Sequence, residues 1–417
     1  MFAMSRPLGP DPNFRLRDLT FSAYIPTVLF SIGQGAVIPV IPLFAKDLGA
    51  SIVVASLIVG LRGLGQFLFD MPAGIAVSKW GDKWTMVLGT AMVGIVAVGA
   101  AFSPSVIALA VLVLIMGGGW AFWQIARLAY VSEVAPIEQR GRALSMLGGL
   151  NRVGNFIGPV IGGGLGAQFG LESAFIAQAV MGVAAAAMMF IVVREGSNTE
   201  QLGGHGLAGR VVDTVVENRT AFLTAGPPMI ALSILRQARQ VFLPLWGDSI
   251  GLNVAQIGAV TSISFFADAG VFYPVGYIMD RFGRKWAAVP CLLTLAVGFL
   301  VLPFTSETYG FGLVAVITGI GNGFGAGINM TLGADLAPDT GRGEFLGVWR
   351  LLADAGQVGG PAVISGLTAI GSLALASFAS AGIGFAGAAM MAFFVAETLK
   401  RPPLVIAKTT TKDKSTV

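Results

Sequence analysis

The sequence predicts an all-α membrane protein in which twelve transmembrane helices form two pseudo-symmetric six-helix bundles. Three observations predict this fold. The composition is too apolar for a water-soluble protein, the apolar residues fall into twelve runs long enough to span a membrane, and the second half of the chain repeats the first. Each observation also restricts the functions that the protein can have.

The composition excludes several classes of protein. Of the 417 residues, 55% are hydrophobic and 12% are charged, and the mean hydropathy is +0.78. Soluble domains carry about 25% charged residues. Cys291 is the only cysteine and His205 the only histidine, so the sequence offers neither a disulfide framework nor a set of metal ligands. We therefore expect no metal and no cofactor.

The apolar runs are continuous, which favours helices over the short alternating strands of a membrane barrel. A spanning helix needs about 20 mostly apolar residues. Twelve runs meet this length when the chain is divided at polar, glycine and proline positions. They are Leu19–Phe44, Ser51–Ser78, Thr85–Phe102, Ser105–Val134, Ala143–Ala167, Glu172–Val193, Ala221–Gly247, Asn253–Met279, Trp286–Thr305, Gly310–Leu336, Glu344–Ile370 and Ser372–Glu397.

The basic residues orient these spans. With the N-terminus inside, 19 of the 26 Lys and Arg residues lie in cytoplasmic segments, six lie within spans, and Lys46 alone lies in an external loop. Cytoplasmic loops of membrane proteins are enriched in Lys and Arg. We therefore expect both termini in the cytoplasm, and the compact loops favour a bacterial inner membrane. The basic tail is expected to contact anionic lipid headgroups.

The two halves match at a constant offset of 202 residues. Gly158 and Pro159, for example, fall on Gly360 and Pro361. Repeated membrane halves are typical of transporters that hold their substrate between the repeats. The predicted organisation is an N-terminal six-helix bundle (1–193), a cytoplasmic linker (194–220), a C-terminal six-helix bundle (221–400) and a basic cytoplasmic tail (401–417).

Two motifs recur in both halves. The loop motif reads GIAVSKWGDK at residues 74–83 and GYIMDRFGRK at 276–285. Its glycines permit a tight turn between two spans. The glycine–proline motif places small residues four apart, which lets a neighbouring helix approach closely. Its members are Gly154, Gly158, Pro159, Gly162 and Gly163 in the fifth span, and Gly356, Gly360 and Pro361 in the eleventh.

On these motifs the sequence resembles the major facilitator superfamily over essentially the whole chain, and the fifth-span motif resembles that of its drug:proton antiporters. The resemblance implies alternating access by rocking of the two bundles. It also implies a cytoplasmic latch with Arg281 near Asp335 and, by the repeat, Lys79 near Glu133. Ser78 replaces the family's aspartate, so we expect a weaker latch there. The gating set is Gly74, Lys79, Gly81, Lys83, Glu133, Arg140, Arg152, Gly276, Asp280, Arg281, Gly283, Arg284, Asp335, Arg342 and Arg350.

Nine charged residues lie inside the predicted spans. Each would cost roughly 2.5–3.5 kcal/mol near the centre of a lone helix, so they must pair or line a wet cavity. In the family the second span meets the eleventh and the fifth meets the eighth. This arrangement implies that Asp70 lies near Arg350 or Asp354 and that Arg152 can reach Asp268. Structural pairing and substrate contact both remain open. The nine are Arg62, Asp70, Arg127, Arg152, Arg236, Arg239, Asp268, Arg350 and Asp354.

Six arginines face three aspartates in this set, and arginine does not lose its proton. The surplus favours a substrate with an anionic group, although a simple helix packing face is the alternative. The substrate candidates are Gln34, Trp120, Trp123, Gln124, Arg127, Arg236, Arg239, Phe242, Asn322 and Asn329. The candidate proton carriers are the carboxylates Asp70, Asp268 and Asp354, because no histidine lies in a span.

The leading interpretation is a monomeric secondary transporter that exports drug-like or amphipathic molecules, including organic anions, with protons as a second partner. The alternatives are a lipid or lysolipid translocator, an importer of an anionic metabolite, and a non-transporting membrane receptor. An enzyme is not expected, because no catalytic constellation is in register on neighbouring spans. The sequence contains no nucleotide-binding loop, and nothing in it indicates nucleic-acid binding.

Overall fold

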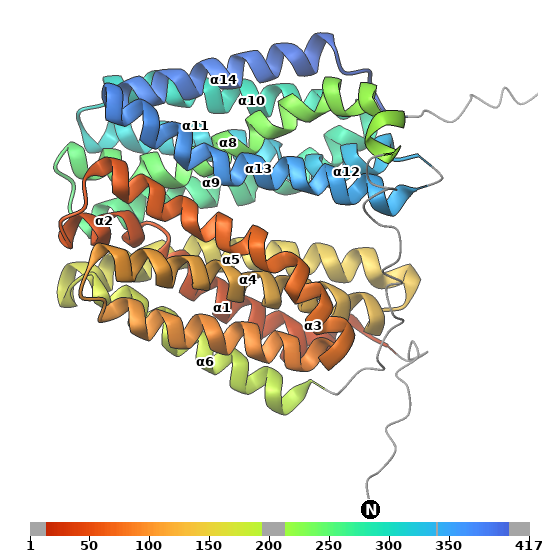
Figure 1. The fold of residues 1–417 in the computed structure, drawn as a ribbon, viewed down its shortest axis with the longest axis horizontal. Helices are drawn as coiled ribbons and strands as arrows, with labels where there is room; N and C mark the ends of the chain where they lie inside the picture. The colour runs from red at the N-terminus through yellow and green to blue at the C-terminus, as the bar shows by residue number, and fades with distance from the viewer. Residues whose placement is uncertain (1–13, 194–212, 339–340, 400–417) are drawn as a thin grey trace, which may run out of the picture.

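The computed structural model describes residues 14–193, 213–338 and 341–399, and within them every regular element is a helix. Two bundles of long helices lie side by side (Figure 1). The helices before residue 194 form one bundle and those after residue 218 form the other. The predicted tail and most of the predicted linker, including His205, lie outside the described residues, so the boundaries of the four predicted segments stay predictions.

The first bundle begins with a broken helix. The predicted span Leu19–Phe44 is interrupted before α2, where Pro39 stands at the N-cap. Proline has no N–H to donate to the preceding turn, so a break is expected there. The helices of this bundle are α1 (Ile25–Val37), α2 (Val40–Asp47), α3 (Ile52–Ala101), α4 (Val106–Val134), α5 (Ile137–Phe169) and α6 (Glu172–Val192).

Helix α3 contains 50 residues and covers two predicted spans, the second and the third. Between them, Gly81 has a backbone φ of 79°, a left-handed conformation that glycine adopts without a steric penalty. The chain reverses at this glycine. This break lies between the ends of the two predicted spans at Ser78 and Thr85.

The second bundle differs from the prediction in one span. The tenth predicted span, Gly310–Leu336, is not continuous, because the chain leaves the helix at residues 325–327 and Gly327 has a φ of 77°. The helices of this bundle are α8 (Arg219–Ser249), α9 (Val254–Arg281), α10 (Lys285–Val301), α11 (Thr308–Phe324), α12 (Ile328–Leu336), α13 (Arg342–Ile370) and α14 (Leu373–Phe393).

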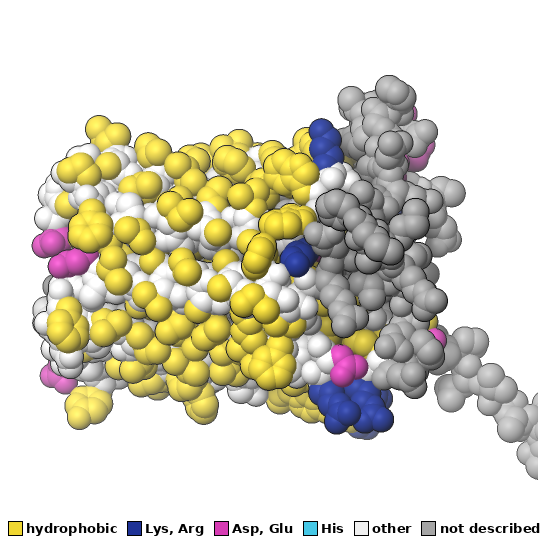
Figure 2. Space-filling view, turned by 90° about the horizontal axis from the view of Figure 1, so that it is seen from below, with side chains coloured by type: hydrophobic (Ala, Val, Ile, Leu, Met, Phe, Trp, Pro, Cys, Tyr) yellow, Lys and Arg dark blue, Asp and Glu magenta, His cyan; other side chains and the backbone are white. Residues whose placement is uncertain are grey.

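Eight helical stretches of the described chain are long and apolar enough to cross a membrane, judged by length and composition. One of them, α3, covers two predicted spans. Helices α5, α8 and α13 fall outside this group because they carry the charged and amide side chains of the interior, and they complete the predicted set. Figure 2 shows hydrophobic side chains along the whole length of one face, with the visible Lys and Arg side chains at one end. The chain is a multi-pass integral membrane protein.

The bundles contact each other mainly through α5 on α9 and α3 on α13. We call the end of the molecule that carries Lys46 the loop end, and the end that carries the turn at Gly81 the terminal end. At the loop end, Lys46 of α2 forms an ion pair with Asp248 of α8. Nearby, the Ser365 hydroxyl donates to the Val53 carbonyl at 2.9 Å. The bundles are therefore joined at the loop end by direct polar contacts.

Backbone contacts between the bundles are also close toward the loop end. A Cβ added to Gly163 of α5 would lie 3.0 Å from the Cα of Gly258 of α9, and one added to Gly60 of α3 would lie 2.8 Å from the Cβ of Pro361. By contrast, a Cβ on Gly270, three turns further along α9, would meet open space. Small residues at the interface let helix backbones approach in this way.

The glycine–proline motif has two packing faces. Gly154, Gly158 and Gly162 lie against α1 of the same bundle, with main-chain or Cβ atoms of α1 where their own Cβ atoms would stand. Gly163, one position further on, faces the other bundle. In the repeat, Gly356 and Gly360 lie against α8. The motif therefore fixes each motif helix to the first helix of its own bundle.

Gly258→Ala is expected to lower the melting temperature of the detergent-purified protein, because the new methyl group would overlap the Pro159 carbonyl oxygen of the other bundle. Gly270→Ala, on the same helix, is the matched control. It adds a methyl group to open space and gains about 1 kcal/mol of helix propensity. Tryptophan fluorescence during heating measures both. Equal melting temperatures for the two variants would contradict the close contact between the bundles.

Candidate functional site

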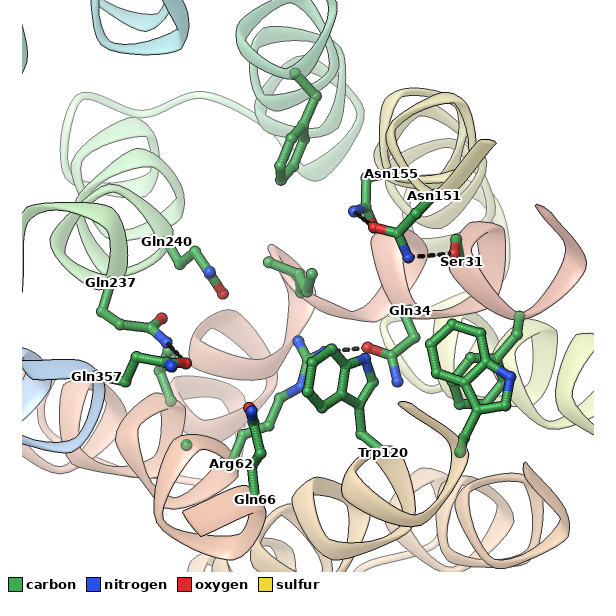
Figure 3. A pocket seen from close by; sticks show the side chains of 16 residues that line it. Ser31, Gln34, Arg62, Gln66, Trp120, Asn151, Asn155, Gln237, Gln240 and Gln357 are labelled. Atoms are coloured by element: carbon green, nitrogen blue, oxygen red, sulfur yellow. Dashed lines mark hydrogen bonds between the residues drawn. The ribbon is translucent and has the colours of Figure 1, made fainter. Parts of the chain in front are cut away.

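A cavity of about 190 Å³ lies between the two bundles. Its walls come from the middle turns of α1, α3, α4 and α5 in the first bundle and of α8, α9 and α13 in the second (Figure 3). Twelve of its 16 lining residues belong to the first bundle. A ligand held here would contact both bundles at once.

The lining is rich in carboxamides, which both donate and accept hydrogen bonds. Asn155 donates to Asn151 at 3.1 Å, and Asn151 donates to the Ser31 hydroxyl at 2.8 Å. Across the cavity, Gln237 of α8 donates to Gln357 of α13 at 3.3 Å. The seven carboxamide residues of the lining are Gln34, Gln66, Asn151, Asn155, Gln237, Gln240 and Gln357. Such a wall suits a ligand with several polar groups.

Arg62 of α3 supplies the one charge among the described lining residues, and no carboxylate lines the cavity with it. Its guanidinium donates to the Gln34 side-chain oxygen (Figure 3). A guanidinium has five N–H donors and binds carboxylates in a bidentate manner. The cavity is therefore better suited to a neutral or anionic ligand than to a cation.

Aromatic rings complete the cavity. Trp120 and Trp123 of α4 have ring centroids 6.4 Å apart, and Phe30 of α1 packs on Trp123 at 4.3 Å. Phe265 of α9 lines the cavity from the second bundle. Ligand pockets commonly combine aromatic walls with a few oriented polar groups.

Three of the ten predicted substrate residues, Gln34, Trp120 and Trp123, line this cavity. Arg127 does not. It is buried behind Trp123, with its guanidinium carbon 3.9 Å from the centroid of that ring. Arg127 donates to Gln124 at 2.6 Å and to the Thr27 hydroxyl at 3.3 Å. Its positive charge is therefore held by neutral oxygens and an aromatic face.

Arg236 and Arg239 also lie outside the cavity lining. Arg236 donates to the carbonyl of Gly325, which is exposed by the break after α11. The C-terminus of a helix carries partial negative charge and stabilises a cation. Arg239 donates to the Ser264 hydroxyl at 3.1 Å and lies over the Phe265 ring. The arginine wall expected from the sequence is therefore not formed around this cavity.

The other predicted substrate residues have structural contacts. Phe242 is fully buried against Phe299. The Asn322 amide donates to Asp268 at 2.9 Å, and the main-chain carbonyl of Asn329 accepts from the Trp349 indole at 2.8 Å. The sequence analysis missed most of the carboxamides. Two pairs carried a signal in the sequence, since Asn151 and Asn155 are four residues apart and Gln237 and Gln240 are three apart within spans.

Ion pairs join the bundles beside the cavity. Arg350 of α13 lies 2.6 Å from Asp70 of α3 and 3.7 Å from Asp354. Arg152 of α5 lies 3.9 Å from Asp268 of α9. These are the partners that the resemblance implied. Asp70 is one helical turn beyond Gln66 in the direction of the terminal end, so its pair borders the cavity on that side.

The second loop motif differs from the expectation. Arg281 does not pair with Asp335, because its guanidinium contacts the Tyr277 hydroxyl. Instead Arg284 lies 2.8 Å from Asp335 and 3.6 Å from Asp280. The reason is the turn after α9, where Gly283 has a φ of 115° and directs the next residue toward α12. These contacts lie within one bundle and do not latch the two together.

The first loop motif differs as well. Lys79 was expected near Glu133, but its side chain is exposed, and no ion pair between the two is found among the described residues. Lys83 lies over the Phe190 ring, 5.4 Å from its centroid. Among the described residues, the ion pairs of Arg350 and Arg152 join the bundles on the terminal side of the cavity. The gating roles of the loop residues stay predictions.

Asp268→Asn is expected to lower the stability of the protein strongly. The Asp268 side chain is 5% exposed, and removing one partner of a buried ion pair costs about 3–5 kcal/mol. Asp280→Asn is the control, because that side chain is 83% exposed. Melting temperatures in the same detergent compare the two variants. A loss no larger for Asp268→Asn than for Asp280→Asn would show that Arg152 does not depend on this carboxylate.

The family model described as Major Facilitator Superfamily matches residues 24–242 and 229–415. NorA of Staphylococcus aureus, named a quinolone resistance protein, is 23% identical over 359 residues, covering 78% of this chain and 87% of NorA. The PmrA homolog of Lactococcus lactis, named a multi-drug resistance efflux pump, is 24% identical over 355 residues, covering 79% of this chain and 83% of its own. An archaeal protein of Methanocaldococcus jannaschii, named an uncharacterized MFS-type transporter, is 20% identical and covers 82% of this chain and 89% of its own.

Solved structures show the same fold at low identity. The nucleoside transporter NupG matches with a TM-score of 0.75 at 14% identity, covering 91% of this chain and all of its own. A bacterial homolog of the human lysosomal transporter Spinster, in an inward-facing conformation, matches with a TM-score of 0.70 at 16% identity, covering 91% of this chain and 97% of its own.

Proposed function

Because the chain belongs to the Major Facilitator Superfamily, a family of transporters rather than enzymes, we propose that it exports small amphipathic molecules with a neutral or anionic polar group. Protons moving in the opposite direction drive this export by alternating access. The names of the NorA and PmrA relatives support drug-like cargo. The proposed orientation puts both termini in the cytoplasm of a bacterial inner membrane, since Lys and Arg gather on that side of the predicted spans.

The observation that carries this proposal is the composition of the cavity. It is walled by both bundles, and it combines aromatic rings with seven carboxamides and the Arg62 guanidinium, with no carboxylate among its described lining residues. An exporter of cations would need an acidic or aromatic cage without a fixed positive charge. Arg62 instead provides an attachment point for a carboxylate or similar acceptor on the cargo.

Alternating access fits the different contacts at the two ends. Toward the loop end the bundles approach through glycine and proline backbone, whereas the Arg350 and Arg152 pairs join them on the terminal side of the cavity. Side-chain ion pairs can separate and re-form without unfolding the helices. Parting of these pairs would connect the cavity to the cytoplasm, and separation at the loop end would connect it to the outside.

Proton coupling needs a carboxylate that can titrate during the cycle. Arg350 lies within 4 Å of both Asp70 and Asp354, so one cation faces two acids. When both acids are ionised the group has an excess negative charge, which a proton neutralises. This arrangement makes Asp354 and Asp70 the proposed carriers, and Asp268 remains paired with Arg152.

Arg62→Gln is expected to raise the apparent KM for carboxylate-bearing substrates by about 10-fold or more, since a charge-assisted hydrogen bond contributes about 1.5–3 kcal/mol. The assay uses proteoliposomes with an imposed pH gradient, an interior pH dye, a quinolone carboxylic acid, a lipophilic cation and a neutral amphiphile. Arg62→Lys, which keeps the charge, should restore part of the activity. An equal loss of transport activity for the cation and the anion would show that Arg62 does not recognise the anionic group of the substrate.

Asp354→Asn is expected to abolish substrate-driven proton movement in the same proteoliposomes, while substrate still moves down its own gradient. Glu138→Gln, an exposed carboxyl at the start of α5, is the control and should behave as the wild type. If the wild-type protein moves substrate without protons, the coupling proposal fails. The protein would then be a lipid translocator or a uniporter.

A further inference from the structure

One carboxamide of the cavity lining, Gln34, differs from the other six in being buried. It lies near the end of α1, and only 4% of its surface is exposed. Its side-chain oxygen accepts a hydrogen bond from the Arg62 guanidinium of α3 (Figure 3). Because a guanidinium has donors and no acceptor, this contact determines which end of the amide faces Arg62. The amide nitrogen of Gln34, with its two N–H donors, is therefore the end that remains.

That nitrogen is enclosed and has no hydrogen-bond partner among the described residues. Buried polar groups are nearly always hydrogen-bonded, because an unpaired one loses the bonds that it had with water. In the described cavity lining, one other enclosed side-chain atom is unpaired in this way, the indole nitrogen of Trp123. Both atoms are donors, and both belong to the first bundle, as Arg62 does. This wall of the cavity is therefore matched to hydrogen-bond acceptors on a ligand.

The position of the Gln34 amide selects one kind of acceptor group. Its oxygen is held by Arg62, so its nitrogen lies only the width of one amide group away from that contact. The two oxygens of a carboxylate have nearly the same separation as the oxygen and nitrogen of an amide. A carboxylate can thus accept from the Arg62 guanidinium with one oxygen and from the Gln34 nitrogen with the other. A hydroxyl group offers one oxygen, and it carries no charge to strengthen the bonds.

We propose that Arg62 and Gln34 form a carboxylate clamp, in which the Gln34 nitrogen supplies the second donor and selects carboxylic acids among the possible cargoes. This inference rests on the proposed export function and narrows its substrate class from neutral or anionic amphiphiles to amphipathic carboxylic acids. The second bundle contributes no charged residue to the described lining. The carboxylate end of the cargo therefore binds the first bundle, and the rest of the molecule faces the carboxamides of α8 and α13.

A purely structural role for Gln34 is the alternative, and it involves only the oxygen that holds Arg62. Gln34→Glu separates the two roles. Glutamate keeps that oxygen, and so keeps Arg62 in place, but it has no N–H donor and its negative charge neutralises the guanidinium. Gln240→Glu is the matched control, because it makes the same substitution in the second-bundle wall of the same cavity.

The test measures ligand binding to the detergent-purified, full-length protein at pH 7.5 by isothermal titration calorimetry. The two ligands are a quinolone carboxylic acid without an amine and the primary alcohol that has a hydroxymethyl group in place of its carboxyl group. The wild type should bind the acid with a Kd about 10-fold or more below that of the alcohol, which is the effect of one charge-assisted hydrogen bond. Gln34→Glu should bring the two Kd values close together, whereas Gln240→Glu should keep most of the difference.

Equal Kd values for the acid and the alcohol in the wild type, or binding of neither, would overturn the inference, and this comparison does not require any variant to fold. A preference for the acid that Gln34→Glu leaves unchanged, or that Gln240→Glu removes equally, would also overturn it, because the selectivity would then come from the charge of Arg62 alone or of the cavity as a whole. Failure of export looks different. A wild type that binds the acid tightly but does not move it across a liposome membrane would contradict the export proposal and leave the clamp in place.

Discussion

The structure depends on one constraint: a charged side chain inside a membrane must be paired or hydrogen-bonded by other groups of the protein. The described interior meets it in two ways. Arg350 and Asp70, and Arg152 with Asp268, pair across the bundles, and these pairs hold the halves together beside the cavity. The remaining arginines are held by helix carbonyls, hydroxyls, amides and aromatic faces. Most of the surplus arginines therefore have structural partners, and Arg62 is the charged residue that lines the cavity.

Glycine determines where the bundles can meet. The glycine–proline motif fixes α5 to α1 and α13 to α8, and two of its members, Gly163 and Pro361, contact the other bundle. One short motif therefore sets both the packing within each half and the contact between halves. This dual use explains why the interface is close toward the loop end, while the contacts that border the cavity on the terminal side are made by long side chains. Such an interface fits the proposed rocking of the bundles around the cavity.

The fold could be predicted from three signals in the sequence. Hydropathy indicates the spans, the Lys and Arg residues indicate their expected orientation, and the repeat indicates two similar bundles. The sequence also predicted ion-pair partners from the family arrangement of helices. It failed where contacts depend on local turns: the position of Gly283 selects Arg284 in place of Arg281, and the break before Gly327 gives Arg236 a carbonyl partner. Most of the amides that line the cavity were not predicted, because a neutral amide inside a span is a weaker indication of function than a charge.

The central claim is that the two bundles rock about one cavity. Cys291 is fully buried, so spin labels can be placed on introduced cysteines, at Ile137 and Phe282 for the terminal end and at Phe169 and Ser249 for the loop end. Distances between the labels in liposomes, with and without a quinolone carboxylic acid and at pH 5.5 and 7.5, test the claim directly. The account predicts that one distance shortens as the other lengthens. Distances that both stay fixed, or that change in the same direction, would contradict it.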